Sequence, residues 1–169
     1  NIQALNYYNL NMGSSGNKTF ATGTTKISGA LSSNGGIGVS STNLSTVEFD
    51  AATSQIVYNM NYYNLNLSGG SKVFSAGTTA ISNTLNLTSA ANVDLRTNNT
   101  TINYNGSAAQ TIRALSYANL ALGSYSTGIK TFEAGTTKIS GSVSTLGAVA
   151  NAITNSSTIE YDGTSAQSI

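Results

Sequence analysis

One line of sequence occurs three times in this chain. Residues 62–82 read YYNLNLSGGSKVFSAGTTAIS, and close variants begin at Tyr7 and at Tyr117. One ending, anchored by Gln55, Gln110 and Gln167, closes each copy, so the unit recurs at intervals of about 55 residues. The copies differ mainly in the length of a Gly/Ser stretch, which is typical of a loop. A tandem repeat of this length predicts a stacked array rather than an ordinary globular core.

The frame of the repeat divides the whole chain. We expect three repeats, at 1–55, 56–110 and 111–169, that form one continuous solenoid. Asn1-Ile2 matches both Thr111-Ile112 and Ser168-Ile169, so the sequence begins and ends at nearly the same point of the unit. Because terminal units of repeat proteins are normally atypical, we expect this chain to be a slice of a longer array.

The apolar residues alternate with a period of two. Ile102 and Tyr104 alternate with asparagines, and Val47 and Phe49 alternate with acidic residues. By the same parity, Tyr63 is predicted to face inward together with the leucines of YNLNL. This spacing, with abundant Thr, Val, Ile and Tyr, predicts strands and no helix of useful length.

A unit of about 55 residues cannot bury a set of one-sided strands alone, so neighbouring coils must close the core. We predict an all-β, parallel β-solenoid with about three coils per repeat, nine in all, in a rod of about 40 Å. Two larger coils per repeat also fit, and a stack of small β-sandwiches fits less well. Equivalent residues are expected to share inward rows: Leu10, Leu65 and Leu120; Phe20, Phe74 and Phe132; Ile27, Ile81 and Ile139. Corner glycines with positive φ are expected at Gly23, Gly77 and Gly135.

The ending TIEYDGTSAQSI, followed by YYNLNLSGGSK and AGTTKISG, resembles repeats of very large secreted or surface-displayed bacterial proteins. These are adhesin-like β-solenoid arrays rich in Asn, Ser and Thr, and the resemblance covers the whole chain. It implies an extracellular or cell-surface fibre or stalk, and it brings no catalytic residues. The third repeat departs most, with Ala118 in place of a second Tyr and a longer GSYSTGIK loop.

Composition excludes several kinds of chemistry. There is no Cys and no His, which rules out Cys–His and Ser–His–Asp catalytic sites and disfavours zinc. Charged residues make up 8% of the chain and the net charge is +1, with no basic cluster for nucleic acid. No apolar run is long enough to insert in a membrane as a helix. We therefore expect no cofactor, no metal and no catalytic residue.

Two carboxylate pairs are the candidates for a catalytic or metal-binding site. Glu48 with Asp50, and Glu160 with Asp162, lie two residues apart on predicted strands and point outward. Such pairs serve glycoside hydrolysis or weak calcium binding in other proteins. We interpret them as solvated charges, because the middle repeat has asparagines at the same places.

Two recurring residue types are candidate ligand contacts. A lysine precedes each repeat phenylalanine, at Lys18, Lys72 and Lys130. These lysines are interpreted either as a row that binds a polyanion or as edge charges that block aberrant strand pairing. A tyrosine precedes the position predicted to face inward, at Tyr7, Tyr62 and Tyr117, and is expected outside as a stacking platform for sugars. Thr pairs such as 24–25 also resemble ice-binding arrays, but they occur once per repeat rather than once per coil.

The sequence favours a non-catalytic structural segment of a long extracellular fibre or adhesin stalk. Its partners are the neighbouring repeats, with self-association into fibres expected through the unpaired end coils. The main alternative is a carbohydrate-binding solenoid that contacts surface polysaccharide through exposed Tyr, Asn and Thr rows. A polysaccharide lyase or hydrolase is the second alternative, and it needs a localised acid–base cluster.

Overall fold

The structure is a computed structural model that describes residues 1–88, 91–123 and 128–167. The elements that it describes are all β-strands, paired almost entirely in parallel, with no helix among these residues. The strands are β1 (Asn6–Tyr7), β2 (Leu10–Ser14), β3 (Asn17–Thr19), β4 (Thr24–Ile27), β5 (Leu31–Asn34), β6 (Ile37–Val39), β7 (Thr46–Phe49), β8 (Gln55–Val57), β9 (Asn61–Leu67), β10 (Lys72–Phe74), β11 (Thr78–Leu87), β12 (Val93–Asp94), β13 (Thr101–Tyr104), β14 (Gln110–Ile112), β15 (Ser116–Tyr117), β16 (Asn119–Leu122), β17 (Lys130–Phe132), β18 (Thr136–Ile139), β19 (Val143–Thr145), β20 (Ala150–Asn151) and β21 (Thr158–Tyr161).

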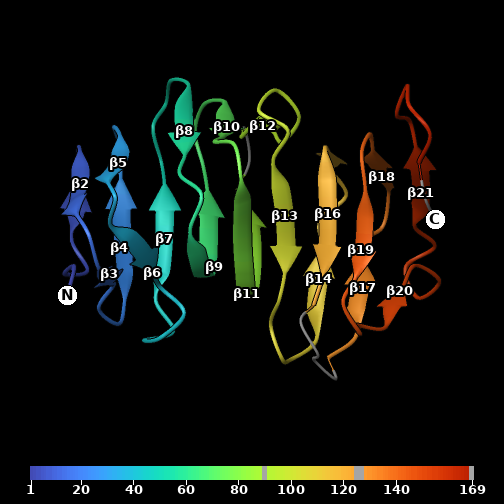
Figure 1. The fold of residues 1–169 in the computed structure, drawn as a ribbon, viewed down its shortest axis with the longest axis horizontal. Helices are drawn as coiled ribbons and strands as arrows, with labels where there is room; N and C mark the ends of the chain where they lie inside the picture. The colour runs from blue at the N-terminus through green and yellow to red at the C-terminus, as the bar shows by residue number, and fades with distance from the viewer. Residues whose placement is uncertain (89–90, 124–127, 168–169) are drawn as a thin grey trace.

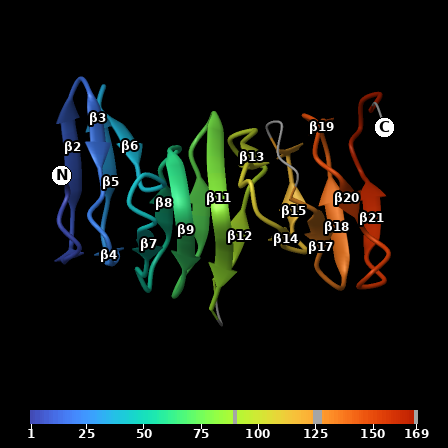
Figure 2. The same cartoon turned by 90° about the horizontal axis from the view of Figure 1, so that it is seen from below.

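The strands coil into a parallel β-solenoid of about eight turns. Strands of successive turns pair with one another, as Val57 pairs with Phe74 and Ile81 with Tyr104. Successive turns line up side by side from the N-terminal to the C-terminal end (Figure 1), and the view from below shows the same order (Figure 2). The nine turns expected from the sequence are therefore too many, because one turn takes up more of the chain than a third of a repeat.

The core runs along the inside of this coil. The predicted alternation is confirmed in β7, where Val47 and Phe49 are fully buried, and in β13, where Ile102 and Tyr104 are fully buried. The largest completely buried side chains are aromatic or branched apolar residues and two lysines: Tyr62, Tyr104, Tyr117, Phe20, Phe49, Phe74, Ile27, Leu65, Leu67, Ile81, Lys72 and Lys130.

The predicted parity is wrong at the start of β9. Tyr62 is fully buried and Tyr63 is only half-buried, whereas Leu65 and Leu67 point inward as expected. The pairing of β9 with β11 shifts register between Ile81 and Thr84, which marks an irregularity in the strand. The extra residue of this bulge lies in β11, opposite Tyr62–Asn64. The inward parity of β9 changes at the same place, so the parity of YNLNL does not extend back to Tyr63.

The predicted inward rows of equivalent residues are also wrong. Ile27, Ile81 and Ile139 never stand beside one another, because each belongs to its own ladder. Each ladder instead reads Tyr, Ile, aromatic and, where a fourth strand follows, Leu: Tyr7–Ile27–Phe49–Leu67, then Tyr62–Ile81–Tyr104–Leu122, then Tyr117–Ile139–Tyr161.

The reason is a mismatch between the repeat and the turn. Following the first ladder for three turns from Ile27 leads to Leu87, and Ile81 falls six residues short of it. The second ladder leads from Ile81 to Thr145, and Ile139 again falls six residues short. A sequence repeat is thus shorter than three turns by the same amount in both cases, so its equivalent residues lie six residues apart along the coil instead of in one row.

Glycine corners are placed as expected. Gly23, Gly77 and Gly135 have φ of +114°, +105° and +118°, a region that L-residues rarely adopt. Residues 124–127, half of the longer GSYSTGIK loop of the third repeat, lie outside the described residues.

Candidate functional site: a glutamine bridge and its groove

Each repeat has a glutamine whose side chain forms hydrogen bonds between two neighbouring turns of the coil. The amide nitrogen donates to two backbone carbonyls one turn earlier, and the amide oxygen accepts from the backbone N–H four residues before the glutamine. The three sets of partners are Ile27 O, Gly29 O and Ala51 N for Gln55; Ile81 O, Asn83 O and Gly106 N for Gln110; and Ile139 O, Gly141 O and Gly163 N for Gln167, all at 2.6–3.2 Å. Because Gln55 and Gln110 are buried, these bonds are shielded from water.

Lys72 and Lys130 lie in the interior, contrary to both sequence interpretations. Their side chains are completely buried and the ammonium groups donate to backbone carbonyls. Lys72 Nζ lies 3.0 Å from Ala51 O and 3.0 Å from Gly70 O, and Lys130 Nζ lies 2.6 Å from Gly106 O and 2.7 Å from Gln110 Oε1. Lys18 is half-buried and donates to Ser14 O and Ser15 O. A row of lysines for a polyanion is therefore excluded, since two of the three ammonium groups are enclosed.

Burial also changes the acidity of these two lysines. Loss of solvent lowers the pKa of Lys72, partly offset by the negative charge of Asp50, and lowers the pKa of Lys130. The carbonyls around each ammonium group stabilise the charge that burial penalises. Lys72 and Lys130 thus hold in place the loops that precede Gln55 and Gln110, through their bonds to Ala51 O and Gly106 O.

The tyrosine platform is absent at two of its three positions. Tyr62 and Tyr117 are fully buried, and their hydroxyls donate to the carbonyls of Tyr58 and Arg113. Burial raises the pKa of both tyrosines well above the usual value. Tyr7 is half-buried, with its hydroxyl 3.2 Å from Gln3 O. The exposed tyrosine is instead Tyr8, which is 75% exposed.

A groove lies beside each of the first two glutamine bridges. The groove of the first repeat, about 780 Å³, is lined by parts of 28–33 and 51–58 together with Tyr8 and Asn9. The groove of the second repeat, about 260 Å³, is lined by 83–86, 109–111 and Arg113. These segments are equivalent in the sequence repeat. No strand pairing joins β5 to β8, or 84–87 to β14, in the part of the chain that the structure describes.

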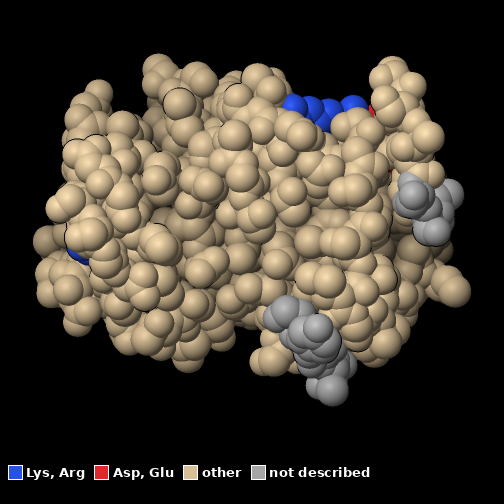
Figure 3. Space-filling view, in the orientation of Figure 1, with Lys and Arg blue, Asp and Glu red and all other residues tan. Residues whose placement is uncertain are grey.

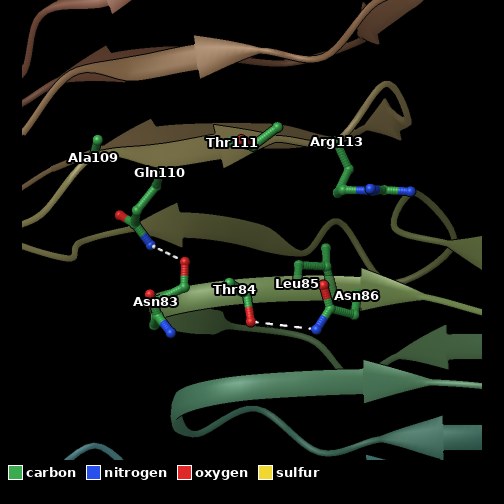
Figure 4. A pocket seen from close by; sticks show the side chains of 8 residues that line it. All are labelled: Asn83, Thr84, Leu85, Asn86, Ala109, Gln110, Thr111 and Arg113. Carbon is green, nitrogen blue, oxygen red and sulfur yellow. Dashed lines mark hydrogen bonds between the residues drawn. The ribbon is translucent and has the colours of Figure 1, made fainter.

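The lining differs between the two grooves. The first has an exposed aromatic and apolar rim, with Tyr8, Ile56 at 60% exposure and the half-buried Tyr58. The second is mainly polar, and Figure 4 shows the Gln110 side chain pointing toward Asn83, whose strand also carries Thr84 and Asn86. Hydroxyl and amide groups beside an aromatic ring are the groups that bind sugars, so the first groove is the better candidate site.

The carboxylates are all engaged in structural contacts. Ion pairs join Lys26 to Glu48, Arg96 to Asp162, Arg113 to Glu133 and Lys138 to Glu160, at 2.8–3.2 Å. Asp50 accepts from the Ser28 hydroxyl and Asp94 from the backbone and side chain of Thr97. Figure 3 shows a face that is nearly free of charge outside one cluster of basic atoms at its upper edge.

The described residues contain no group of three or more His, Cys, Asp or Glu side chains placed to hold a metal ion. Within the same residues, no helix is long and apolar enough to cross a membrane.

Sequence reasoning missed the grooves and the buried lysines. Gln55 stands out as a repeat anchor, but its partners lie one turn earlier, at a distance in sequence that only the true turn length reveals. The recurrence of Lys two residues before each Phe was the signal for burial, since this spacing gives the lysine the same inward parity as the phenylalanine. The exposure of Tyr8 was hidden by the incorrect parity of the YYNLNM segment at 7–12.

Comparison of the sequence with protein-family models, with curated proteins and with solved structures gives no match.

Proposed function

We propose that this chain is a non-catalytic structural segment of a long extracellular surface fibre or adhesin stalk. The observation that carries the proposal is the continuity of the ladders: parallel pairing passes from turn to turn along the rod, and a dry core of stacked side chains follows it. A structure built this way resists bending because no hinge separates its units. The adhesin-like resemblance of the repeat supports an extracellular location.

We further propose that the sequence repeat is the structural unit, at about two and two-thirds turns. The six-residue shortfall measured from Ile81 and from Ile139 supports this value. Each unit is then rotated by a third of a turn against its predecessor, and three units complete eight turns. Grooves and ion pairs follow this rotation around the rod rather than forming a line on one face.

The proposal that the chain forms a stiff stalk can be tested with concatemers, in which copies of the chain are joined end to end. Two or three copies are joined directly from Gln167 to Asn1, which keeps the spacing of nine residues seen between Gln55 and Asn64 and between Gln110 and Asn119. If the concatemer is a stiff rod, small-angle scattering is expected to give the same cross-section for every concatemer and a length that rises in proportion to the number of copies. A matched concatemer with a ten-residue Gly/Ser linker at each junction is the control for flexible beads. Indistinguishable scattering from the two concatemers contradicts the stalk.

The second candidate function is contact with a surface polysaccharide, favoured by the aromatic rim of the first groove. Tyr8 and Ile56 expose apolar surface beside serine, threonine and asparagine groups in one hollow. The test is a glycan array with the unchanged chain, Tyr8→Ala and Tyr63→Ala. Binding that depends on Tyr8 supports this function, and binding equal in all three proteins removes it.

A further inference from the structure

The two ends of the rod carry strands that lack a partner on one side. Within the described residues, β21 pairs with β18 alone and β2 pairs with β5 alone. The equivalents of β21, which are β7 and β13, are each covered by a strand of the next turn. That covering strand reads NLNL at 64–67 and NLAL at 119–122.

The chain itself contains the missing strand. Residues 9–12 read NLNM and occupy the same place in the repeat as 64–67 and 119–122. The pairing of these segments with the following turn is already the same, because Leu10 pairs with Leu31 as Leu65 pairs with Leu85 and Leu120 with Val143. On its other side, β2 lacks the strand that β7 and β13 provide for its equivalents.

Burial at the C-terminal end shows the same gap. Val47 and Phe49 are fully buried under their covering strand, as are Ile102 and Tyr104, whereas Ile159 and Tyr161 remain half-buried. An apolar cavity of about 320 Å³ is lined here by residues of the last turns, including Ile139, Ile159 and Tyr161. Figure 1 places β21 at the end of the rod opposite β2.

We propose that a second copy of this chain docks its β2 on β21, head to tail, with a defined register. The internal pairings Thr46–Asn64, Val47–Leu65, Glu48–Asn66 and Phe49–Leu67 give the register of the interface directly. It aligns Thr158 with Asn9, Ile159 with Leu10, Glu160 with Asn11 and Tyr161 with Met12 of the second copy. The contact is heterologous and stacks copies along the rod axis, so it does not close into a ring and propagates into an open fibre.

The ammonium group of Lys18 fits the same interface. Its equivalents Lys72 and Lys130 donate to carbonyls of the glutamine loop of the preceding repeat, at Ala51 O and Gly106 O. The corresponding carbonyl for Lys18 is that of Gly163 in the first copy. Lys18 therefore becomes enclosed when the copies dock, as its two equivalents are enclosed within the chain.

A backbone donor gives the sharpest test. Leu10 N donates to Ala30 O within the chain, so by the alternation of a parallel ladder the Asn11 N–H points to the open side. Asn11→Pro removes this donor, and Asn11→Ala keeps it while losing the same side-chain bond to Gly13 N. Sedimentation velocity over a wide concentration range is expected to show association of the unchanged chain and of Asn11→Ala, weakened about tenfold or more by Asn11→Pro.

Equal association of the two Asn11 variants, both checked for native circular dichroism and melting temperature, overturns the proposed contact. A strictly monomeric unchanged chain at several hundred micromolar overturns it as well. Neither outcome bears on the concatemer test, in which the junction is covalent, so failure of the docking and failure of the stalk are distinguishable.

Cross-linking tests the register. The chain has no cysteine, so Glu160→Cys and Asn11→Cys chains can be mixed and oxidised. Opposed residues on neighbouring strands lie about 4.8 Å apart, within the range of a disulfide, and the mixed disulfide is expected. Ser32→Cys replaces Asn11→Cys as the control, because Ser32 pairs with Asn11 and lies one strand further away. Equal yields, or a dominant Asn11→Cys homodimer, contradict the register.

Discussion

The buried glutamine bridge gives the most demanding stability prediction. Gln110→Met keeps the volume of the side chain and removes four hydrogen bonds: two to Ile81 O and Asn83 O, one from Gly106 N and one from Lys130 Nζ. At about 1 kcal/mol net for each bond, the loss is about 4 kcal/mol, of which apolar burial of the methionine offsets about 1 kcal/mol. The variant is therefore expected to lose about 3 kcal/mol, or a melting temperature lower by about 6–12 °C.

The assay is urea unfolding of Gln110→Met beside the matched variant Gln167→Met. Gln167 makes the same three backbone contacts, but it is half-buried and bonds no lysine in the described residues. Its replacement is expected to cost about 1 kcal/mol, because water can reach this half-buried site and replace the lost partners. Equal losses below about 1 kcal/mol in both variants, at unchanged m-value, would show that water reaches the Gln110 bridge and would refute the reasoning.

Three further predictions concern the core, the pH response and a corner. Ile102→Lys places a charge in the dry core and is expected to cost several kcal/mol of stability. Asn103→Lys is expected to cost far less, because Asn103 is half-buried on the outer side. Equal losses of the two variants in chemical denaturation would contradict the register of β13. Burial raises the pKa of Tyr104 to about 12, so the unfolded state releases this proton first and stability falls as the pH rises from about 10 to 12. Tyr104→Phe should remove about 2–3 kcal/mol of that alkaline loss, measured as the difference in unfolding free energy between pH 9 and pH 12, and an unchanged difference would mean that the hydroxyl ionises equally in both states. Gly135→Ala, at φ +118°, is expected to destabilise the chain by about 1–2 kcal/mol in thermal unfolding, and a neutral result would show that the corner relaxes to a conformation open to alanine.

The fold class could be predicted because its signals are local. Period-two alternation at Val47–Phe49 and Ile102–Tyr104 identifies strands that bury one face, and the glycine at each corner is required by a positive φ. Repeat length then indicates stacking. None of these inferences needs knowledge of which strand pairs with which, so they hold whatever the pairing is.

Most of the failures depend on the length of a turn. The expected row of Ile27, Ile81 and Ile139 assumed that a repeat holds a whole number of turns, and the register shows that it does not. Burial of Lys72 depends on Ala51 O, a distant carbonyl in the sequence that one turn of the coil brings within 3.0 Å. The bulge of β11 opposite Tyr63 was equally invisible, because it changes the geometry of a strand without changing its composition.

A repeat of about two and two-thirds turns, as we propose, would also determine how such a protein changes in evolution. Gain or loss of one repeat by recombination preserves every ladder, because the junction always joins the same strand types, but it rotates everything beyond the junction by a third of a revolution. A stalk of this kind varies in length and in the direction of its distal part at the same time. Only changes of three repeats, about 38 Å at the spacing of neighbouring strands, leave that direction as it was.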